Sequence, residues 1–159
     1  MKSIAAIRLA ARELVRELGC LTQPFSAYGL SLSQCHTLIE LEMRGKMNIS
    51  QLSDLLNLER SSVSRLVKIL QDHQLILTQI DPNDGRSKIL QLTDNGYKLL
   101  KNLHDEFNKR IAPALEQLSE IEYNYVLKGL SIYAVALRNS RVINSRADRI
   151  DSESLAEKL

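Results

Sequence analysis

Residues 49–92 carry the pattern that most restricts the fold of this chain. Two short amphipathic helical segments, QLSDLLN at 51–57 and SSVSRLVKILQDH at 61–73, follow each other after a very short turn, which is typical of a helix-turn-helix. Two apolar, β-branched runs come next, at 75–80 and 88–92, and the turn-forming sequence DPNDGRS separates them. We therefore expect a β-hairpin directly after the helix-turn-helix. This order predicts a winged helix-turn-helix unit over residues 33–97.

Helical periodicity dominates the rest of the chain. Residues 4–18 predict an amphipathic helix that stops at Gly19, and a second helix follows the connection at 21–32. Further helices are expected after the hairpin, and the second of these opens on the capping-box sequence SEIE at 119–122. Pro113 should kink or split the helix before it. The expected N-caps are Ser33, Ser50, Thr93 and Ser119.

Composition excludes several classes of protein. Apolar residues make up 44% of 159 residues, so one globular domain over 1–159 is expected, mainly α with a small β-hairpin wing. No apolar run is long enough to span a membrane, and no signal peptide is evident, so we expect a cytoplasmic protein. No nucleophile motif, phosphate loop or metal-ligand spacing predicts an enzyme, a cofactor or a metal site. A net charge of +2 does not by itself indicate nucleic-acid binding.

The helix at 61–73 separates an apolar side from a polar, cationic side. At about 100° per residue, four aliphatic side chains fall together and small hydroxyls and cations fall opposite. Short serines permit close approach to a major groove, Arg65 can bond a guanine bidentately, and Lys68 can meet base acceptors or phosphates. An ordinary solvated helix face would look similar, but the hairpin that follows favours DNA. The predicted major-groove residues are Ser61, Ser62, Ser64, Arg65 and Lys68, with Arg60 and Lys88 on the DNA backbone.

The hairpin carries an arginine at its tip. Arg86 follows Asp84 and Gly85 in the turn, where a surface ion pair with Asp84 is the simplest interpretation. Our functional interpretation is that Asp84 orients Arg86 so that it enters a minor groove, where narrow A·T tracts attract arginine.

These stretches resemble the MarR family of bacterial transcription regulators. The resemblance rests on LSLSQCHTLIEL (30–41), ISQLSDLLNLERSSVSRLVKILQDHQLI (49–76) and DPNDGRSKILQLTDNG (81–96), and the last of these is the most specific. It contains the family's wing signature, here Asp84, Arg86, Leu92, Thr93 and Gly96. One departure is Gln74, which stands where the family usually has glycine between the recognition helix and the wing.

The resemblance implies a homodimer on a pseudo-palindromic double-stranded operator. Residues 1–32 and 98–138 would form the dimerisation helices. The composition turns polar from about residue 139, so we expect a loosely held polar tail over 139–159, which a short terminal helix could end. Family members usually repress transcription, and many release DNA when a small molecule or an oxidant binds between the two regions. The residues expected to line such an effector pocket are Phe25, Tyr28, Cys35 and His36.

Three alternatives stay open beside a ligand-released repressor. A thiol-based redox regulator would use Cys20 or Cys35, and Cys35 is the better candidate because it begins a helix, although it lies on an apolar stripe. A winged helix can also bind proteins only, but such a surface would be apolar or acidic rather than rich in Ser, Arg and Lys. An architectural DNA binder without an effector is the third.

Overall fold

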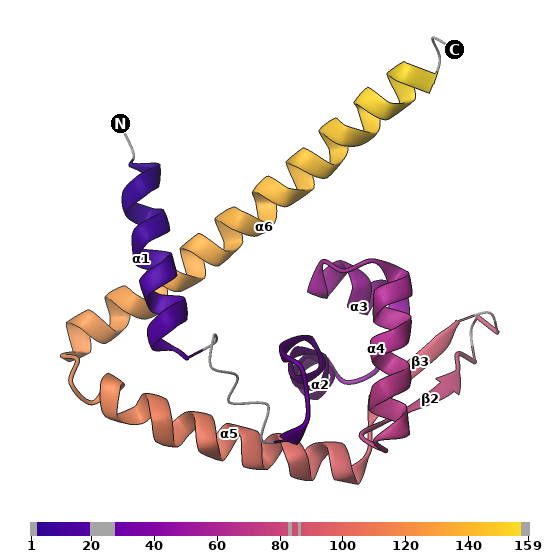
Figure 1. Cartoon of the computed structure of the whole chain (residues 1–159), viewed down its shortest axis with the longest axis horizontal. Helices are drawn as coiled ribbons and strands as arrows, with labels where there is room; N and C mark the ends of the chain where they lie inside the picture. Colours follow the sequence, from indigo (N-terminus) through magenta and orange to yellow (C-terminus); the bar gives the residue numbers. More distant parts are fainter. Residues whose placement is uncertain (1–2, 20–27, 83, 86, 157–159) are drawn as a thin grey trace. The chain divides into compact units, whose positions relative to one another are not determined.

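The computed structural model describes residues 3–19, 28–82, 84–85 and 87–156, and for 142–156 it describes the backbone alone (Figure 1). The chain is mainly helical with a small antiparallel sheet, which confirms the predicted fold class. None of the described helices is both long enough and apolar enough to cross a membrane. The elements in chain order are α1 (Ile4–Glu17), α2 (Leu32–Arg44), β1 (Met47–Asn48), α3 (Ile49–Leu56), α4 (Arg60–Asp72), β2 (Ile76–Ile80), β3 (Lys88–Leu92), α5 (Asp94–Leu115) and α6 (Glu120–Ala156).

The chain divides into two compact units, residues 1–109 and 110–159. The first unit holds the hydrophobic core, to which α2, α3, α4, the sheet and the first half of α5 contribute. Because the chain lacks Trp and has few aromatics, this core is almost wholly aliphatic. The largest fully buried side chains are those of Leu38, Leu41, Leu52, Leu70, Leu90 and Leu100.

The wing is a three-stranded antiparallel sheet in the order β1-β3-β2. The predicted hairpin is confirmed, with Ile76 opposite Leu92 and Ile80 opposite Lys88. The sequence did not predict β1, in which Met47 pairs with Leu90, because two residues are too few to display an alternating pattern. Gly45, with φ +75°, ends α2 and turns the chain into this short strand.

Two of the predicted helix starts are wrong by two residues. The N-cap of α2 is Ser31 rather than Ser33, and the N-cap of α3 is Asn48 rather than Ser50. In each case the side chain of a glutamine three residues later, Gln34 or Gln51, accepts a hydrogen bond from the amide of the cap residue and completes a reciprocal capping box. This second hydrogen bond selects the earlier cap.

Thr93 joins the end of the wing to the start of α5. Its hydroxyl accepts a hydrogen bond from the Gly96 amide at 3.1 Å, as expected of an N-cap, and donates one to the Gln74 carbonyl at 2.7 Å. The Thr93 amide also donates to the Leu75 carbonyl at 3.1 Å. A Cβ atom at position 96 would collide with that same Leu75 carbonyl, so glycine is required there. Thr93 and Gly96 thus hold α5 against the turn between α4 and β2.

The capping box of α6 is confirmed. The Ser119 amide donates to Oε2 of Glu122 at 2.9 Å, and the Glu122 amide donates to Oγ of Ser119. The Ser119 hydroxyl also donates to Oε2 of Glu122 at 2.6 Å, and this bond, together with the one from the Ser119 amide, lowers the pKa of the Glu122 carboxyl.

Helix α6 then extends to Ala156, so the expected loose tail after residue 138 is helical instead. Residues 130–156 contain neither Gly nor Pro, and therefore nothing in the polar sequence stops the helix. Pro113 does not split α5, which ends only two residues later at Leu115, so the proline disturbs the last turn alone.

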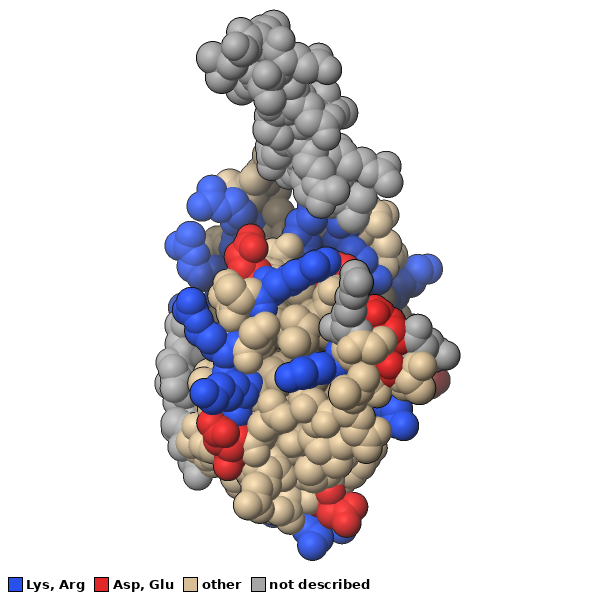
Figure 2. Space-filling model, turned by 90° about the vertical axis from the view of Figure 1, so that its right-hand side faces the viewer, with Lys and Arg blue, Asp and Glu red and all other residues tan. Residues whose placement is uncertain are grey.

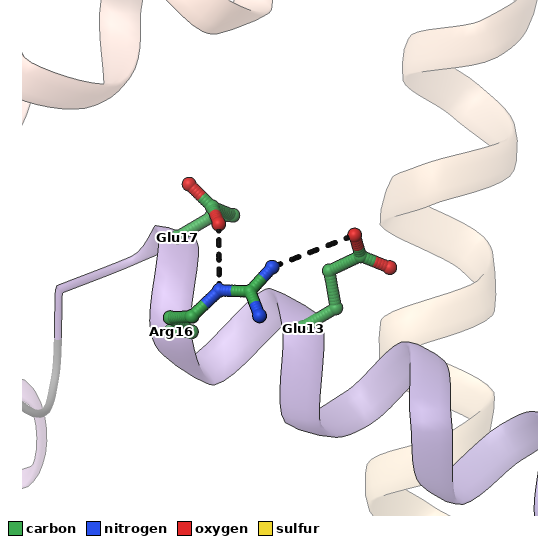
Figure 3. A network of polar contacts seen from close by, with 3 residues as sticks. All are labelled: Glu13, Arg16 and Glu17. Atoms are coloured by element: carbon green, nitrogen blue, oxygen red, sulfur yellow. Dashed lines mark hydrogen bonds and ion pairs between the residues drawn. The ribbon is translucent and has the colours of Figure 1, made fainter.

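Helix α1 presents a polar side and an unpartnered apolar side. Ser3 caps it, and the Arg16 guanidinium lies between Glu13 and Glu17, at 3.7 and 2.9 Å (Figure 3). No residue of α1 is buried within the described chain, and Ile4 and Ile7 on the apolar side are 74% and 47% exposed.

Gln74 adopts a left-handed backbone conformation, with φ +56°. Its Cβ makes this conformation unfavourable by about 1–2 kcal/mol, which explains why the family favours glycine there.

We predict that Gln74→Gly raises the free energy of unfolding by up to about 1 kcal/mol. The relief of strain is offset in part by the greater freedom of glycine in the unfolded chain. Urea unfolding followed by circular dichroism measures this change. Gln74→Ala is the control: it removes the same side chain but keeps Cβ, and an equal gain from it would contradict the strain argument.

Candidate nucleic-acid interface

Helix α4 exposes the polar side that the sequence predicts and buries the apolar one. Val63, Leu66, Val67 and Leu70 are buried in the core of the first unit. On the other side, six residues of the predicted DNA-contacting set are exposed, namely Arg60, Ser61, Ser62, Ser64, Arg65 and Lys68. The helical spacing thus brings three hydroxyls and three cations to one surface, while DNA contact by these residues stays a prediction.

The electrostatics of this surface suit an anion. Within the described part of the chain, Arg60, Arg65 and Lys68 form no ion pair, so their donors face solvent. No acidic residue lies in the first turn of α4, and the N-cap Glu59 makes no side-chain hydrogen bond to the helix. The amides of that turn therefore add partial positive charge. On the side of the molecule that faces the viewer in Figure 2, Lys and Arg are spread over the surface, with separate acidic patches between them.

Two contacts that the sequence did not reveal fix α4. At its start, Asn57 takes a left-handed conformation (φ +54°) and the Ser53 hydroxyl donates to the Leu58 carbonyl, which together set the tight turn after α3. At its end, Gln71 Nε2 donates to Thr78 Oγ1 at 2.9 Å, which ties α4 to β2. Neither contact follows from periodicity, because both depend on residues that the turn brings together.

The loop of the wing is held by its backbone. The Asp81 amide donates to the Ser87 carbonyl at 2.9 Å, and the Ser87 amide donates to the Asp84 carbonyl at 2.8 Å. Asp84 and Lys88 are exposed beside this turn. Arg86 lies outside the described residues, so its orientation by Asp84 stays a prediction.

The predicted effector residues are only partly brought together. Cys35 is fully buried in the core and Tyr28 packs against the same cluster, but His36 is exposed on α2 and lies apart from it. Phe25 and Cys20 lie outside the described residues. The Tyr28 hydroxyl donates to Glu106 of α5 at 3.0 Å, and this hydrogen bond raises the pKa of the phenol.

A second polar contact joins α5 to α2. His104 Nε2 lies 2.7 Å from Oε2 of Glu42, with both side chains partly exposed. No group of three or more side chains that could hold a metal ion is found among the described residues. The pair instead connects the segment after the wing to the helix that precedes the helix-turn-helix.

The profile of the MarR family matches residues 30–88, which run from α2 to the start of β3. This segment of the chain therefore matches the MarR family of transcription regulators. The chain is 28% identical over 112 residues to YfiV of Bacillus subtilis (strain 168), an uncharacterized HTH-type transcriptional regulator. The alignment covers 70% of each chain. Three further Bacillus subtilis matches, 25–26% identical, are also named HTH-type transcriptional regulators, and the alignments span 63–66% of their lengths.

Solved structures of MarR-type regulators share the fold. A MarR protein from Peptoclostridium difficile superposes with a TM-score of 0.74 at 18% identity, covering 87% of this chain and 92% of that one. BpsR of Bordetella bronchiseptica, whose DNA binding is regulated by 6-hydroxynicotinic acid, superposes with a TM-score of 0.67 at 18% identity, covering 84% and 96%. The proteins matched by sequence are named as regulators rather than enzymes.

Burial makes Cys35 an unreactive thiol. Desolvation raises its pKa to about 11, so almost none of it is thiolate near neutral pH.

We predict that, in a Cys20→Ser background, Cys35 reacts with a disulfide reagent at least about 100-fold more slowly in the native protein than in urea at the same pH. The reaction rate at pH 7.5 (roughly physiological) measures this ratio. Similar rates in both conditions would instead support Cys35 as a redox sensor.

Proposed function

We propose that this protein is a homodimeric, sequence-specific DNA-binding regulator that represses transcription and is released by a small molecule. The observation that carries the proposal is the exposed face of α4, where Ser61, Ser64, Arg65 and Lys68 lie opposite the buried stripe and next to the wing. A partner protein would be met by apolar or acidic side chains more often than by this set.

The exposed face matches the requirements of a major groove. Ser61, Ser62 and Ser64 are short enough to let the backbone of α4 approach base edges or phosphates. Arg65 projects from the middle of the face, where it can bond O6 and N7 of a guanine. Arg60 and Lys88 would bond the DNA backbone, and Arg86 would enter the minor groove from the wing with Asp84 beside it.

Exposed apolar side chains on α1 and α6 support a homodimer. Along α6, Val126, Leu130 and Leu137 are 43–48% exposed and recur at helical spacing on one side. Ile4, Ile7 and Val15 add exposed apolar area on one side of α1. An exposed apolar stripe on either helix is a feature of interaction surfaces, and a second copy is the partner that the family resemblance implies. Two copies of α4 would then read the half-sites of a pseudo-palindrome.

A small-molecule effector fits better than an oxidant. Cys35 is buried with a raised pKa, which argues against it as a redox thiol. Tyr28 is half-buried against the core and bonded to Glu106 of α5, so a ligand that displaced this contact would disturb the join between α5 and the segment before α2. The regulation of BpsR by 6-hydroxynicotinic acid is a precedent within the same fold. As a regulator of transcription, the protein would act in the cytoplasm.

Arg65→Ala should weaken binding to a DNA site selected from random sequence by about 1–3 kcal/mol and relax the preference for one base pair. Fluorescence anisotropy across a salt series measures the loss. The matched control is Arg16→Ala, which removes an arginine paired with glutamates on α1 and should leave the affinity unchanged. Equal affinities for the wild type and Arg65→Ala would contradict the assignment of α4 to the groove.

Leu130→Asp should weaken self-association by at least about 100-fold, because a carboxylate would be buried unpaired in an apolar interface. Sedimentation equilibrium over a concentration series measures the dissociation constant. The control is Lys46→Asp, which introduces the same residue at an exposed position between α2 and β1, away from α1 and α6 in the sequence, and should leave the dimer intact. A protein that is monomeric before substitution, or dimeric after it, would refute this interface.

A further inference from the structure

Ile69 is the one aliphatic side chain on the exposed face of α4. It is 43% exposed, whereas the four aliphatic residues of the buried stripe are 0–8% exposed. A β-branched residue gains nothing from a solvated helix position and is slightly unfavourable there. Packing against the core therefore does not account for the exposed part of this side chain.

The position of Ile69 on the helix places it among the residues proposed to meet DNA. At about 100° per residue it lies one turn after Arg65 and two turns after Ser62, on the same side of the helix as both, at the edge nearest the buried Leu66. Gln71, which is bonded to Thr78 of β2, falls on the other flank of the exposed face. The hairpin therefore lies away from Ile69 and does not account for it either.

The length of the face also fits a groove. From Ser61 to Ile69 the helix rises about 12 Å at 1.5 Å per residue, which corresponds to about three to four base-pair steps of 3.4 Å. A helix whose serines and Arg65 lie in the groove would therefore carry Ile69 to a base pair further along it.

We infer that Ile69 is a specificity-determining residue that packs on the 5-methyl group of a thymine in the operator. This inference rests on the proposed function and deepens it. The 5-methyl group is the apolar feature that a T·A pair presents in the major groove, and the minor groove offers none. Burying one methyl group corresponds to about a fourfold gain in affinity.

The test replaces thymine by deoxyuridine, which lacks only this methyl group and keeps every hydrogen-bonding atom. A binding site is first selected by the wild-type protein from random-sequence DNA, and each thymine is then replaced singly. We expect one position in each half-site at which deoxyuridine weakens wild-type binding about fourfold. For Ile69→Ala the same replacement should have no effect, while circular dichroism shows the same unfolding transition as the wild type.

Ile80→Ala is the matched control. Ile80 is 70% exposed at the end of β2, outside α4, so this variant should keep the full preference for thymine. If no thymine is methyl-dependent, or if Ile69→Ala keeps the same dependence as the wild type, the inference is overturned while the DNA-binding function stands. If the wild type enriches no sequence, the sequence-specific function fails, and the inference fails with it.

Discussion

The packing of one aliphatic stripe determines which side of the recognition helix the protein presents. The core of the first unit buries Val63, Leu66, Val67 and Leu70. The 3.6-residue period of the helix then determines the direction in which the side chains between them face. The hydroxyls and cations of α4 face outward because these four side chains face inward. Burial of each stripe residue contributes about 1.5–3 kcal/mol, so the orientation of the exposed face is tied to the stability of the whole unit.

A set of hydrogen bonds also connects the turn after α4, the wing and the start of α5. Thr93 bonds the Gln74 carbonyl and the Gly96 amide, and its own amide bonds the Leu75 carbonyl. The turn at Gln74 and Leu75 is thus held by the first residues of α5, and its backbone is left-handed at a residue that is not glycine. Such strain persists only where neighbouring hydrogen bonds impose the conformation. Together with the His104–Glu42 contact, these bonds make α5 an integral part of the winged-helix unit rather than a helix attached to its end.

Periodicity and turn chemistry were enough to predict most of the fold. The four helices around the helix-turn-helix, both strands of the hairpin and the caps at Thr93 and Ser119 were found from sequence, because each depends on residues close together in the chain. The strand β1 was missed because its two residues form a strand only when Leu90 and Ile89 lie beside them. The polarity of the segment after residue 138 does not predict loose structure, because the segment contains no helix breaker and is helical to Ala156.

For the candidate site, the sequence predicted the exposed face of α4 but not what positions it. The bond between Gln71 and Thr78 and the bond between Tyr28 and Glu106 join residues whose pairing is determined by tertiary structure. His36 was expected in a pocket with Cys35, yet consecutive helical residues point about 100° apart, and one is exposed where the other is buried.

The bare apolar side of α1 has a consequence for how the protein responds to its own abundance. A helix of 14 residues with no buried side chain is marginal in water by itself. If a second copy supplies its missing neighbours, the order of α1 obeys mass action, and helix content falls on dilution before the winged-helix core is lost. A cell that makes little of this protein would then hold it as separate chains with frayed N-termini, and each rise in synthesis would convert more of it into the bivalent form. The steepness of its response to expression level would thus be set by the dissociation constant of its helices.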